Sequence, residues 1–436
     1  MNGTIYALSS APGRAGVAVV RVSGPAAGAV AERLCGIVPV PRRAALRALM
    51  GSDGTAIDAA LVLWFAGPAS FTGEDVVEFH VHGGRAIVER LFAEISKIAD
   101  TRPAEPGEFT RRAVENGKLD LTQAEAVIDL IDAETEAQRR QALGQYGGAL
   151  SAIYEDWRVR LVRALAWAEA EIDFSTEELP ADVRARVIAQ VTDIVGEIEL
   201  HLADGRQGEI VRDGLFLTVI GPPNAGKSSL INVLAKRDVA IVAETAGTTR
   251  DIIEVRLNIG GFLVLVADTA GLRETRDAVE NEGVRRALKR TEQSDLVLLL
   301  LDGSQDEPLA GLPEGMVESA DLVVWNKADL PAPRRHEGLH ISLKTGLGIT
   351  NLLEILGKAV SERLGLRTEA PVVTRARHRR ALEDASAALG RALEARDAEL
   401  FAEDLRLAVR AIGRITGKVD VEDLLDVVFR DFCIGK

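Results

Sequence analysis

The sequence has little of several residue types, and each scarcity excludes a class of protein. Its 436 residues include only two cysteines, Cys35 and Cys433, which excludes a disulfide framework and a four-cysteine zinc site. The longest strongly apolar run, residues 296–301, is far too short to span a bilayer, and residues 1–10 lack the pattern of a signal peptide. We therefore expect a cytoplasmic protein with reduced thiols and no membrane anchor.

Basic residues are in the minority, since 52 Lys and Arg face 66 Asp and Glu and give a net charge of −14. A protein that grips nucleic acid over its whole surface needs a basic footprint, so this balance leaves room only for local patches. Arg375, Arg377, Arg379 and Arg380 cluster at a predicted helix start, where the helix dipole disfavours cations. A phosphate-binding patch is one interpretation of this cluster, and a solvated helix face is the more common one.

Hydrophobic residues make up 47% of the chain, as in a globular protein, and the length fits about three domains. Residues 1–118 contain short β-branched runs between Gly and Pro turns, which predict strands at residues 17–22, 60–65 and 76–81. Residues 119–212 and 370–436 have apolar positions at three- and four-residue steps, which predict long helices. Thr122 and Glu125 predict a capping box at the first of these helices.

Residues 213–369 have a different pattern, in which apolar runs alternate with helical stretches. Strands are expected at residues 215–220, 262–267, 295–301, 321–325 and 339–342. This alternation predicts a parallel sheet with helices on both faces. The whole pattern predicts a multidomain fold, partly α+β and partly α/β, with an α/β domain inserted into a discontinuous helical domain whose two halves pack together.

Residues 221–228 read Gly-Pro-Pro-Asn-Ala-Gly-Lys-Ser and match the phosphate-binding pattern G-x-x-x-x-G-K-S. The motif follows an apolar strand and precedes a helical stretch, which is the context that it requires. In such a loop the backbone N–H groups converge on the phosphates. Lys227 is expected to contact the β- and γ-phosphates, and the Ser228 hydroxyl is expected to ligate Mg²⁺.

Four further motifs follow in order along about 120 residues. Thr248 and Thr249 lie in a loop where a Thr can ligate Mg²⁺ and sense the γ-phosphate. Residues 268–271, Asp-Thr-Ala-Gly, follow an apolar strand, where the Asp supports Mg²⁺ and the Gly N–H reaches the γ-phosphate. Asp329, in Asn326-Lys327-Ala328-Asp329, can accept two hydrogen bonds from a guanine edge, and Ser342-Leu343-Lys344 completes the base-binding loop. The set resembles the motifs of the translation-factor-related GTPases and predicts GTP rather than ATP.

The residue that should orient the attacking water is not evident. Leu272 follows the Asp-x-x-Gly motif at the position where many regulatory GTPases have Gln, and Leu cannot orient water. The carboxylates that could replace it are Glu274, Asp277, Glu280 and Glu282, each of which could equally be a surface charge. Arg250 and Arg273 are open candidates for an arginine finger.

Both ends of the chain contain further candidate residues. Glu78, His80 and His82 alternate on one face of a predicted strand, which suggests a metal site or, more commonly, a polar face suited to an amine or pterin-like ligand. The chain ends in Phe432-Cys433-Ile434-Gly435-Lys436, which fits a prenylation box poorly. A frayed tail with a buried Cys and a mobile arm that carries a thiol and an ammonium group into a site are the two interpretations.

Several longer motifs, most of them outside the nucleotide loops, accompany the phosphate-binding residues Pro223-Asn224-Ala225-Gly226-Lys227-Ser228-Ser229. They are Pro12-Gly13-Arg14, Arg21-Val22-Ser23-Gly24, Phe71-Thr72-Gly73-Glu74-Asp75, His82-Gly83-Gly84, Glu105-Pro106-Gly107-Glu108-Phe109-Thr110, Lys118-Leu119-Asp120-Leu121-Thr122-Gln123-Ala124-Glu125, Ala246-Gly247-Thr248-Thr249-Arg250-Asp251 and Cys433-Ile434-Gly435-Lys436. With them, the whole chain resembles the MnmE (TrmE) family of tRNA-modification GTPases. The N-terminal and C-terminal motifs are specific to that family, whereas ribosome-assembly GTPases share the nucleotide motifs.

The resemblance implies four segments. Residues 1–118 would form a tetrahydrofolate-binding and dimerisation domain similar to folate-binding aminomethyltransferases. Residues 119–212 and 370–436 would form the two halves of the helical domain, and residues 213–369 an inserted Ras-like GTPase domain. The folate, as the 5,10-methylene or formyl form, would contact Arg21, Glu78, Lys118 and Lys436.

The resemblance also implies the metals and catalytic groups of the GTPase site. Ser228 and Thr249 would ligate Mg²⁺, while the Asn224 side chain and the backbone around Ala243, Thr245 and Thr248 would hold K⁺. Glu280 would position the attacking water, and the catalytic set would be Glu280, Lys227, Thr249 and Cys433. The complete predicted GTP site comprises Asn224, Ala225, Gly226, Lys227, Ser228, Ser229, Ala243, Thr245, Thr248, Thr249, Asp268, Thr269, Ala270, Gly271, Asn326, Lys327, Asp329, Ser342, Leu343 and Lys344.

The family's partners follow from the same resemblance. It implies a homodimer, meeting of the two GTPase domains during hydrolysis, and a heterotetramer or larger complex with the FAD-dependent protein MnmG (GidA). Together they would build an aminomethyl-type group at C5 of the wobble uridine of certain tRNAs. The alternatives are a ribosome-assembly GTPase without modification chemistry and a folate transferase with a regulatory GTPase domain.

Overall fold

The computed structural model describes residues 3–173, 182–237, 239–241, 254–267, 294–310, 312, 315–331, 337–364 and 371–419, with 425, 428–429, 432–433 and 435. The chain forms two compact units, each assembled from separate segments. The first unit comprises Met1–Ile128, Gln145–Thr192 and Asp384–Lys436, and the second comprises Asp129–Gly144 and Asp193–Glu383. The division into segments 1–118, 119–212, 213–369 and 370–436 remains a prediction.

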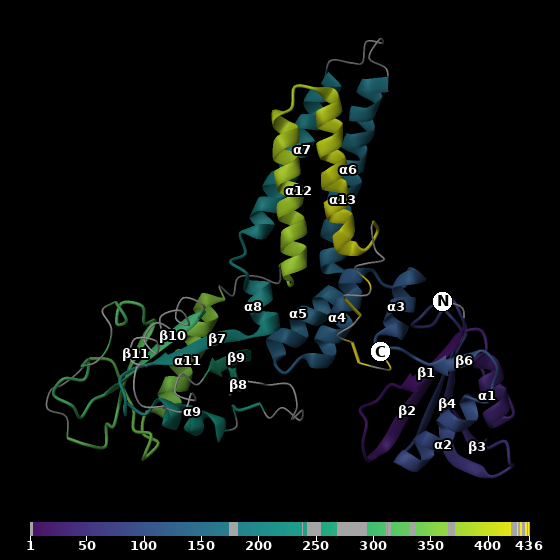
Figure 1. Ribbon diagram of the computed structural model, residues 1–436, viewed down its shortest axis with the longest axis horizontal. Helices are drawn as coiled ribbons and strands as arrows, with labels where there is room; N and C mark the ends of the chain where they lie inside the picture. Colours follow the sequence, from purple (N-terminus) through teal and green to yellow (C-terminus); the bar gives the residue numbers. More distant parts are fainter. Residues whose placement is uncertain are drawn as a thin grey trace, which may run out of the picture. The chain divides into compact units, whose positions relative to one another are not determined.

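The first unit contains a six-stranded sheet in the order β3-β4-β5-β2-β1-β6. The strands are β1 (Thr4–Leu8), β2 (Ala15–Ser23), β3 (Ala45–Met50), β4 (Ala56–Phe65), β5 (Val76–Gly83) and β6 (Thr101–Pro103). All neighbouring pairs are antiparallel except β1 with β6. The three strands expected from the sequence exist and are a few residues longer, whereas β1, β3 and β6 were not predicted. Figure 1 shows both chain ends beside this sheet.

The two faces of this sheet differ in what covers them. Helices α1 (Ala27–Cys35) and α2 (Arg85–Ile95) pack on one face over a core that includes Val20, Val62 and Phe79. On the other face, α3 (Glu108–Glu115) places Phe109 against Ile5 and Ala7 of β1. Farther along that second face, Leu46 of β3 lies opposite Leu61 of β4, and their exposed fractions are 66% and 48%. Side chains alternate in and out along a strand, so this apolar exposure follows from the pleat.

Six further helices of the described residues belong wholly or partly to the first unit. They are α4 (Leu121–Asp132), α5 (Glu136–Tyr146), α6 (Ala149–Asp173), α7 (Asp182–Leu202), α12 (Ala376–Glu394) and α13 (Ala398–Thr416). Helix α6 packs along α13 and buries Leu150, Trp157 and Leu161, which belong to the apolar stripe expected from the sequence. Helices α4, α5, α7 and α12 each contain residues of both units.

The predicted capping box at the start of α4 is wrong by two residues. The Asp120 carboxylate accepts a hydrogen bond from the Gln123 backbone N–H (2.9 Å), and the Gln123 side chain accepts one from the Asp120 N–H (3.1 Å). Asp120 therefore caps the helix reciprocally with Gln123. Thr122 is buried and donates to Asp120 instead. The family motif around Leu119 contains two overlapping patterns that fit a capping box, and tertiary burial of Thr122 decides between them.

The second unit contains a six-stranded sheet in the order β12-β11-β10-β7-β9-β8. The strands are β7 (Leu215–Ile220), β8 (Glu254–Ile259), β9 (Phe262–Ala267), β10 (Leu296–Asp302), β11 (Leu322–Asn326) and β12 (Leu339–His340). The five expected strands pair in parallel, and the unpredicted strand β8 pairs antiparallel with β9 at the edge. Helices α9 (Lys227–Ala235) and α11 (Ile349–Arg363) pack on one face, and Met316 packs on the other.

A short helix, α8 (Gln207–Asp213), leads into β7. Among the helices of the described residues, none combines the length and the apolar composition that crossing a membrane requires.

Candidate functional site

The phosphate-binding loop lies at the carboxyl end of β7, in the middle of the second sheet. Its neighbours β9 and β10 lie on opposite sides of β7, so the loop occupies the position where the strand order changes direction. Open parallel sheets bind ligands at such a position. Gly221 has a φ of +150°, and a Cβ atom there would lie 2.1 Å from the Leu300 carbonyl oxygen. Only glycine allows the loop to approach β10 this closely.

Lys227 is held by the loop that it belongs to. Its ammonium group donates hydrogen bonds to the carbonyl oxygens of Gly221 (2.8 Å) and Pro222 (2.9 Å). The same residue begins α9, whose first backbone N–H groups are free of intrahelical partners by geometry. An ammonium group and a helix N-terminus together favour a polyphosphate at this place. Asn224 has a φ of +62°, a conformation that Asn tolerates better than most residues.

Asn326, at the end of β11, joins the phosphate loop to the base-binding loop. Its amide nitrogen donates to the Ala225 carbonyl (2.8 Å), and its amide oxygen accepts from the Leu343 N–H (3.3 Å). Gly226 makes room for this side chain, since a Cβ at position 226 would lie 2.5 Å from the Asn326 nitrogen. The asparagine therefore fixes the distance between the parts of the site that would hold phosphate and base.

The base-binding carboxylate is oriented by its neighbours. Asp329 accepts a hydrogen bond from the Ser342 hydroxyl (2.7 Å), which lowers the pKa of this carboxyl below its ordinary value. It is therefore ionised at neutral pH and can accept two N–H groups of a guanine. Lys327 makes an ion pair with Asp302 at the end of β10 (2.6 Å), which fixes its position beside Asp329.

The structure thus brings together two predicted groups of residues at the carboxyl edge of one sheet. One group runs from Asn224 to Ser229, and the other comprises Asn326, Lys327, Asp329, Ser342, Leu343 and Lys344. Other predicted residues lie outside the described part of the chain, namely Ala243, Thr245, Thr248, Thr249, Arg250, Asp268, Thr269, Ala270, Gly271, Leu272, Arg273, Glu274, Asp277, Glu280, Glu282 and Lys436.

A second cluster of predicted residues lies on the first sheet. Arg21 of β2 is opposite Glu78 of β5 in the strand register, and its Nε donates to the Glu78 carboxylate (2.9 Å). The guanidinium carbon lies over the rings of Phe71 and Phe109, at 5.4 and 5.6 Å from their centroids. These cation–π contacts fix the arginine. The Nε2 atom of His80 lies 3.4 Å from the other oxygen of Glu78.

The C-terminal residues also lie against the first sheet. The Ser9 hydroxyl donates to the Gly435 carbonyl (2.9 Å), and the Gly107 N–H donates to the Cys433 carbonyl (3.3 Å). Cys433 itself is exposed and forms no disulfide. Lys118 follows the C-terminal end of α3, and its ammonium group donates to the Pro68 carbonyl (3.0 Å). The C-terminal segment is therefore docked on the unit that also contains Arg21 and Glu78.

Sequence reasoning missed some of the groups that shape these sites. It did not anticipate that Asn326 links the two loops, or that Phe71 and Phe109 both contact Arg21. The scarcity of aromatic residues, 4% of the chain, could have drawn attention to two Phe residues inside family motifs. It also counted Arg375 and Arg379 as a candidate phosphate patch, but Arg375 pairs with Asp129, and Arg379 pairs with Asp204 and Glu209.

The fold and the site define the class of protein, a P-loop nucleotide-binding protein whose base-binding loop fits guanine. Family models match almost the whole chain. The model described as "GTP-binding protein TrmE N-terminus" matches residues 4–118, and the "MnmE helical domain" model matches residues 121–433. The chain belongs to the MnmE (TrmE) family of tRNA modification GTPases.

Curated relatives align with this chain over nearly the full length of both proteins. The tRNA modification GTPase MnmE of Parvibaculum lavamentivorans is 54% identical over 444 residues, covering 99% of this chain and 100% of that protein. The proteins of the same name from Maricaulis maris and Paramagnetospirillum magneticum are both 51% identical, with full coverage of both chains. Among solved structures, the G domain of the T. maritima FeoB iron transporter is 22% identical, with a TM-score of 0.26, covering 34% of this chain and 98% of that chain.

Proposed function

We propose that this protein hydrolyses GTP to GDP and phosphate, and that this cycle drives modification of tRNA. One observation supports the nucleotide assignment above all others: Asn326 holds the phosphate loop at Ala225 and the base loop at Leu343 in one rigid arrangement. The Asp329 carboxylate beside it fits the N1–H and 2-amino group of guanine, which adenine lacks. The names of the relatives support the link to tRNA.

In the reaction, water attacks the γ-phosphorus, and the bond to the β–γ bridging oxygen breaks. Lys227 would stabilise the charge on the β- and γ-phosphate oxygens, since an ammonium group offsets charge that develops in the transition state. Its ammonium group already lies at the phosphate loop, where it donates to the carbonyl oxygens of Gly221 and Pro222. Glu280 is proposed to orient the water, and Thr249 to contribute to the same site.

We propose that two metal ions assist this step. Mg²⁺ would be held by Ser228 and Thr249, and K⁺ by the Asn224 side chain with backbone oxygens around Ala243, Thr245 and Thr248. The position of Ser228 and Asn224 at the loop, where neither is buried, leaves their oxygens accessible to a cation. A monovalent cation would supply the positive charge that an arginine finger supplies in other GTPases.

The first sheet is proposed to bind a one-carbon tetrahydrofolate, in the 5,10-methylene or formyl form, through Arg21, Glu78, Lys118 and Lys436. An ion pair between an arginine fixed by aromatic rings and a carboxylate offers both a donor group and an acceptor to a pterin ring. Cys433, docked beside this sheet, would contribute a thiol. The product would be an aminomethyl-type group at C5 of a tRNA wobble uridine, made with the FAD-dependent partner MnmG in a heterotetramer or larger complex.

We also propose a homodimer through the first sheet. Its second face exposes Leu46 and Leu61, at 66% and 48%. Exposed apolar side chains that lie together on one face of a sheet are typical of a protein–protein interface. The two GTPase domains of such a dimer are proposed to meet during hydrolysis.

The nucleotide assignment can be tested by GTP hydrolysis in K⁺ and in Na⁺, with Asp329→Asn and the exposed Asp306→Asn as a matched control. We expect faster hydrolysis in K⁺ and a fall in kcat/KM for GTP of on the order of 10²-fold in Asp329→Asn, because an amide replaces one acceptor with a donor. The same variant should gain activity on xanthosine triphosphate. Equal use of GTP by both variants would refute the role of Asp329, and wobble-uridine analysis distinguishes a tRNA-modifying enzyme from a ribosome-assembly GTPase.

A further inference from the structure

The β8–β9 hairpin connects the two loops that are proposed to contact the γ-phosphate. Strand β8 begins at Glu254, shortly after Thr248 and Thr249, and β9 ends at Ala267, directly before Asp268. Movement of either loop would therefore be transmitted along a strand of this hairpin. A signalling role for the hairpin rests on the proposed GTPase function and adds a route by which that site acts on another part of the chain.

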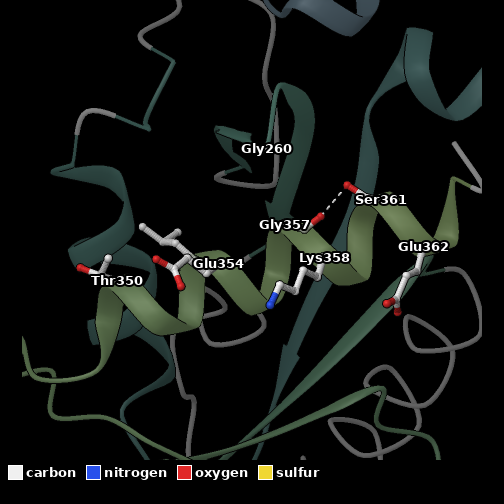
Figure 2. A pocket seen from close by; sticks show the side chains of 8 residues that line it. Gly260, Thr350, Glu354, Gly357, Lys358, Ser361 and Glu362 are labelled. Atoms are coloured by element: carbon white, nitrogen blue, oxygen red, sulfur yellow. Dashed lines mark hydrogen bonds between the residues drawn. The ribbon is translucent and has the colours of Figure 1, made fainter.

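The tip of the hairpin is held between two helices. The Gly261 carbonyl accepts a hydrogen bond from the Ala137 N–H in the first turn of α5 (3.2 Å). On the side of α11, Gly260 lies so close to Gly357 that a Cβ at position 260 would be 3.6 Å from its Cα. Figure 2 shows Gly260 above Gly357, in a pocket lined by Thr350, Glu354, Lys358, Ser361 and Glu362. Backbone contacts of this kind transmit displacement directly because no flexible side chain intervenes.

An ion pair reinforces the contact with α5. Arg256 of β8 donates to the Glu134 carboxylate just before α5 (2.6 Å). The Glu134 N–H in turn donates to the Gln138 side chain (3.0 Å), whose amide nitrogen donates to the Arg212 carbonyl (2.9 Å). Ala137 also packs against the apolar core of the second sheet. The start of α5 is thus attached to β8 by an ion pair, to the turn by a backbone hydrogen bond and to the core by apolar contact.

Helix α4, directly before this segment, has its two ends in different surroundings. Near its C-terminal end, Asp129 makes ion pairs with Arg212 (3.0 Å) and Arg375 (2.7 Å). Near its N-terminal end, Leu121 and Ala124 form a small core with Leu425, Phe429 and Phe432. Phe432 is the residue before Cys433. One continuous helix of 12 residues therefore links the hairpin contacts to the packing beside the C-terminal thiol.

We propose that the β8–β9 hairpin, the start of α5 and helix α4 form a relay by which the nucleotide state sets the exposure of Cys433. Arg256 and Glu134 are positioning residues in this relay and do not contact the nucleotide. Because the pair is partly exposed, with 44% and 22% of the side chains accessible, its loss should leave the fold intact. This ion pair would make the start of α5 move together with the hairpin.

The test uses the full chain in a Cys35→Ala background, which leaves Cys433 as its single cysteine. Maleimide labelling of Cys433 is measured with GDP and with a non-hydrolysable GTP analogue, in K⁺, for Glu134→Arg, for Arg256→Glu and for the double charge swap. In the parent and in the double charge swap, we expect the labelling rates with the two nucleotides to differ by at least about threefold. In each single variant, we expect the two rates to be equal. Arg139→Glu is the matched control, since Arg139 pairs within the same region with Glu136 and should behave as the parent.

The outcomes separate this relay from the function on which it rests. The relay would be wrong, and the GTPase assignment would stand, if the parent hydrolysed GTP but its Cys433 were labelled at the same rate with both nucleotides. Single variants with the full nucleotide response, or a swap that fails to restore it, would also overturn the relay. A parent that neither binds nor hydrolyses GTP would remove both proposals.

Discussion

Glu108 and Arg112, one turn apart on α3, are a charged pair inside the protein, with side chains only 2% and 4% exposed. Glu108 also accepts hydrogen bonds from Arg102 and from the Glu105 N–H. Burial by itself raises the pKa of Glu108, but the hydrogen bonds from Arg102, Glu105 and Arg112 outweigh it, and the pKa lies below its ordinary value. This family-motif residue is therefore explained by stability and has no need of a catalytic role.

Glu108→Gln should lower the free energy of unfolding at pH 7 by about 3 kcal/mol, because it leaves a buried arginine with one carboxylate partner fewer. A group with a lowered pKa in the folded state stabilises above its unfolded pKa, and that contribution is lost as the pH falls through its folded pKa. The difference in free energy of unfolding between the variant and the parent should therefore become smaller as the pH falls. Urea unfolding at pH 7 and at lower pH measures this, with Glu115→Gln as the control on the same helix. Glu115 pairs with Arg111 at the surface, so the control should cost under about 1 kcal/mol.

At the scale of elements, the C-terminal segment depends on close backbone contact. Gly435 has a φ of +101°, and a Cβ at this position would lie 2.1 Å from the Leu8 carbonyl oxygen. Gly107 has a similar constraint, since its Cβ would lie 2.9 Å from Phe429 and from Phe432. The backbone of this segment therefore packs directly against β1 and the start of α3. These contacts fix the position of Cys433.

Gly435→Ala should displace this segment. We expect tRNA modification to fall by at least about tenfold with GTP hydrolysis within about twofold, since the nucleotide site lies in the other unit. Carboxypeptidase digestion should remove the end of the variant faster than that of the parent. Gly36→Ala has a positive φ but open space around it, so it controls for the backbone conformation alone. Unchanged modification in Gly435→Ala would mean that docking of the segment is not required.

Two strands of the second sheet, β10 and β8, differ in how clearly their sequence pattern predicts them. Strand β10 is predicted correctly because it is fully buried and continuously apolar. Strand β8 was missed because Glu254, Arg256 and Asn258 alternate with apolar residues in a six-residue edge strand, a weak signal beside the longer apolar runs. Its partner β9 and its antiparallel direction come from pairing, which no local pattern contains.

At the scale of the whole molecule, the net charge of −14 and the use of arginines in ion pairs limit nucleic-acid binding. Arg379 is 15% exposed and bridges Asp204 (2.7 Å) and Glu209 (2.8 Å), which are themselves 7% and 5% exposed. Its charge is neutralised inside the protein. We therefore expect most of the affinity for tRNA to come from the partner protein.

The isolated chain should bind tRNA with a Kd no tighter than about 10⁻⁶ M at physiological salt, as measured by fluorescence anisotropy. Arg379→Ala should leave that affinity unchanged and lower the free energy of unfolding by about 3 kcal/mol, because the buried carboxylates of Asp204 and Glu209 each lose an ion-pair partner. Arg380→Ala, at an exposed position of the same helix, should change stability by under about 0.5 kcal/mol. Tight tRNA binding with a steep salt dependence, abolished by Arg379→Ala, would instead identify this cluster as the tRNA site.

The sequence by itself determined the family, the order of the nucleotide motifs and most strands of the second sheet. These features are local, since a glycine-rich loop between a buried strand and a helix, or an apolar run between turns, has its meaning within a few residues. Tertiary structure decided which distant residues meet. Arg21 faces Glu78 through strand pairing, Asn326 binds a loop that lies 101 residues earlier in the chain, and Arg375 and Arg379 face carboxylates rather than solvent. Such contacts depend on long-range packing, and a one-dimensional pattern does not specify the neighbour across a sheet or between helices.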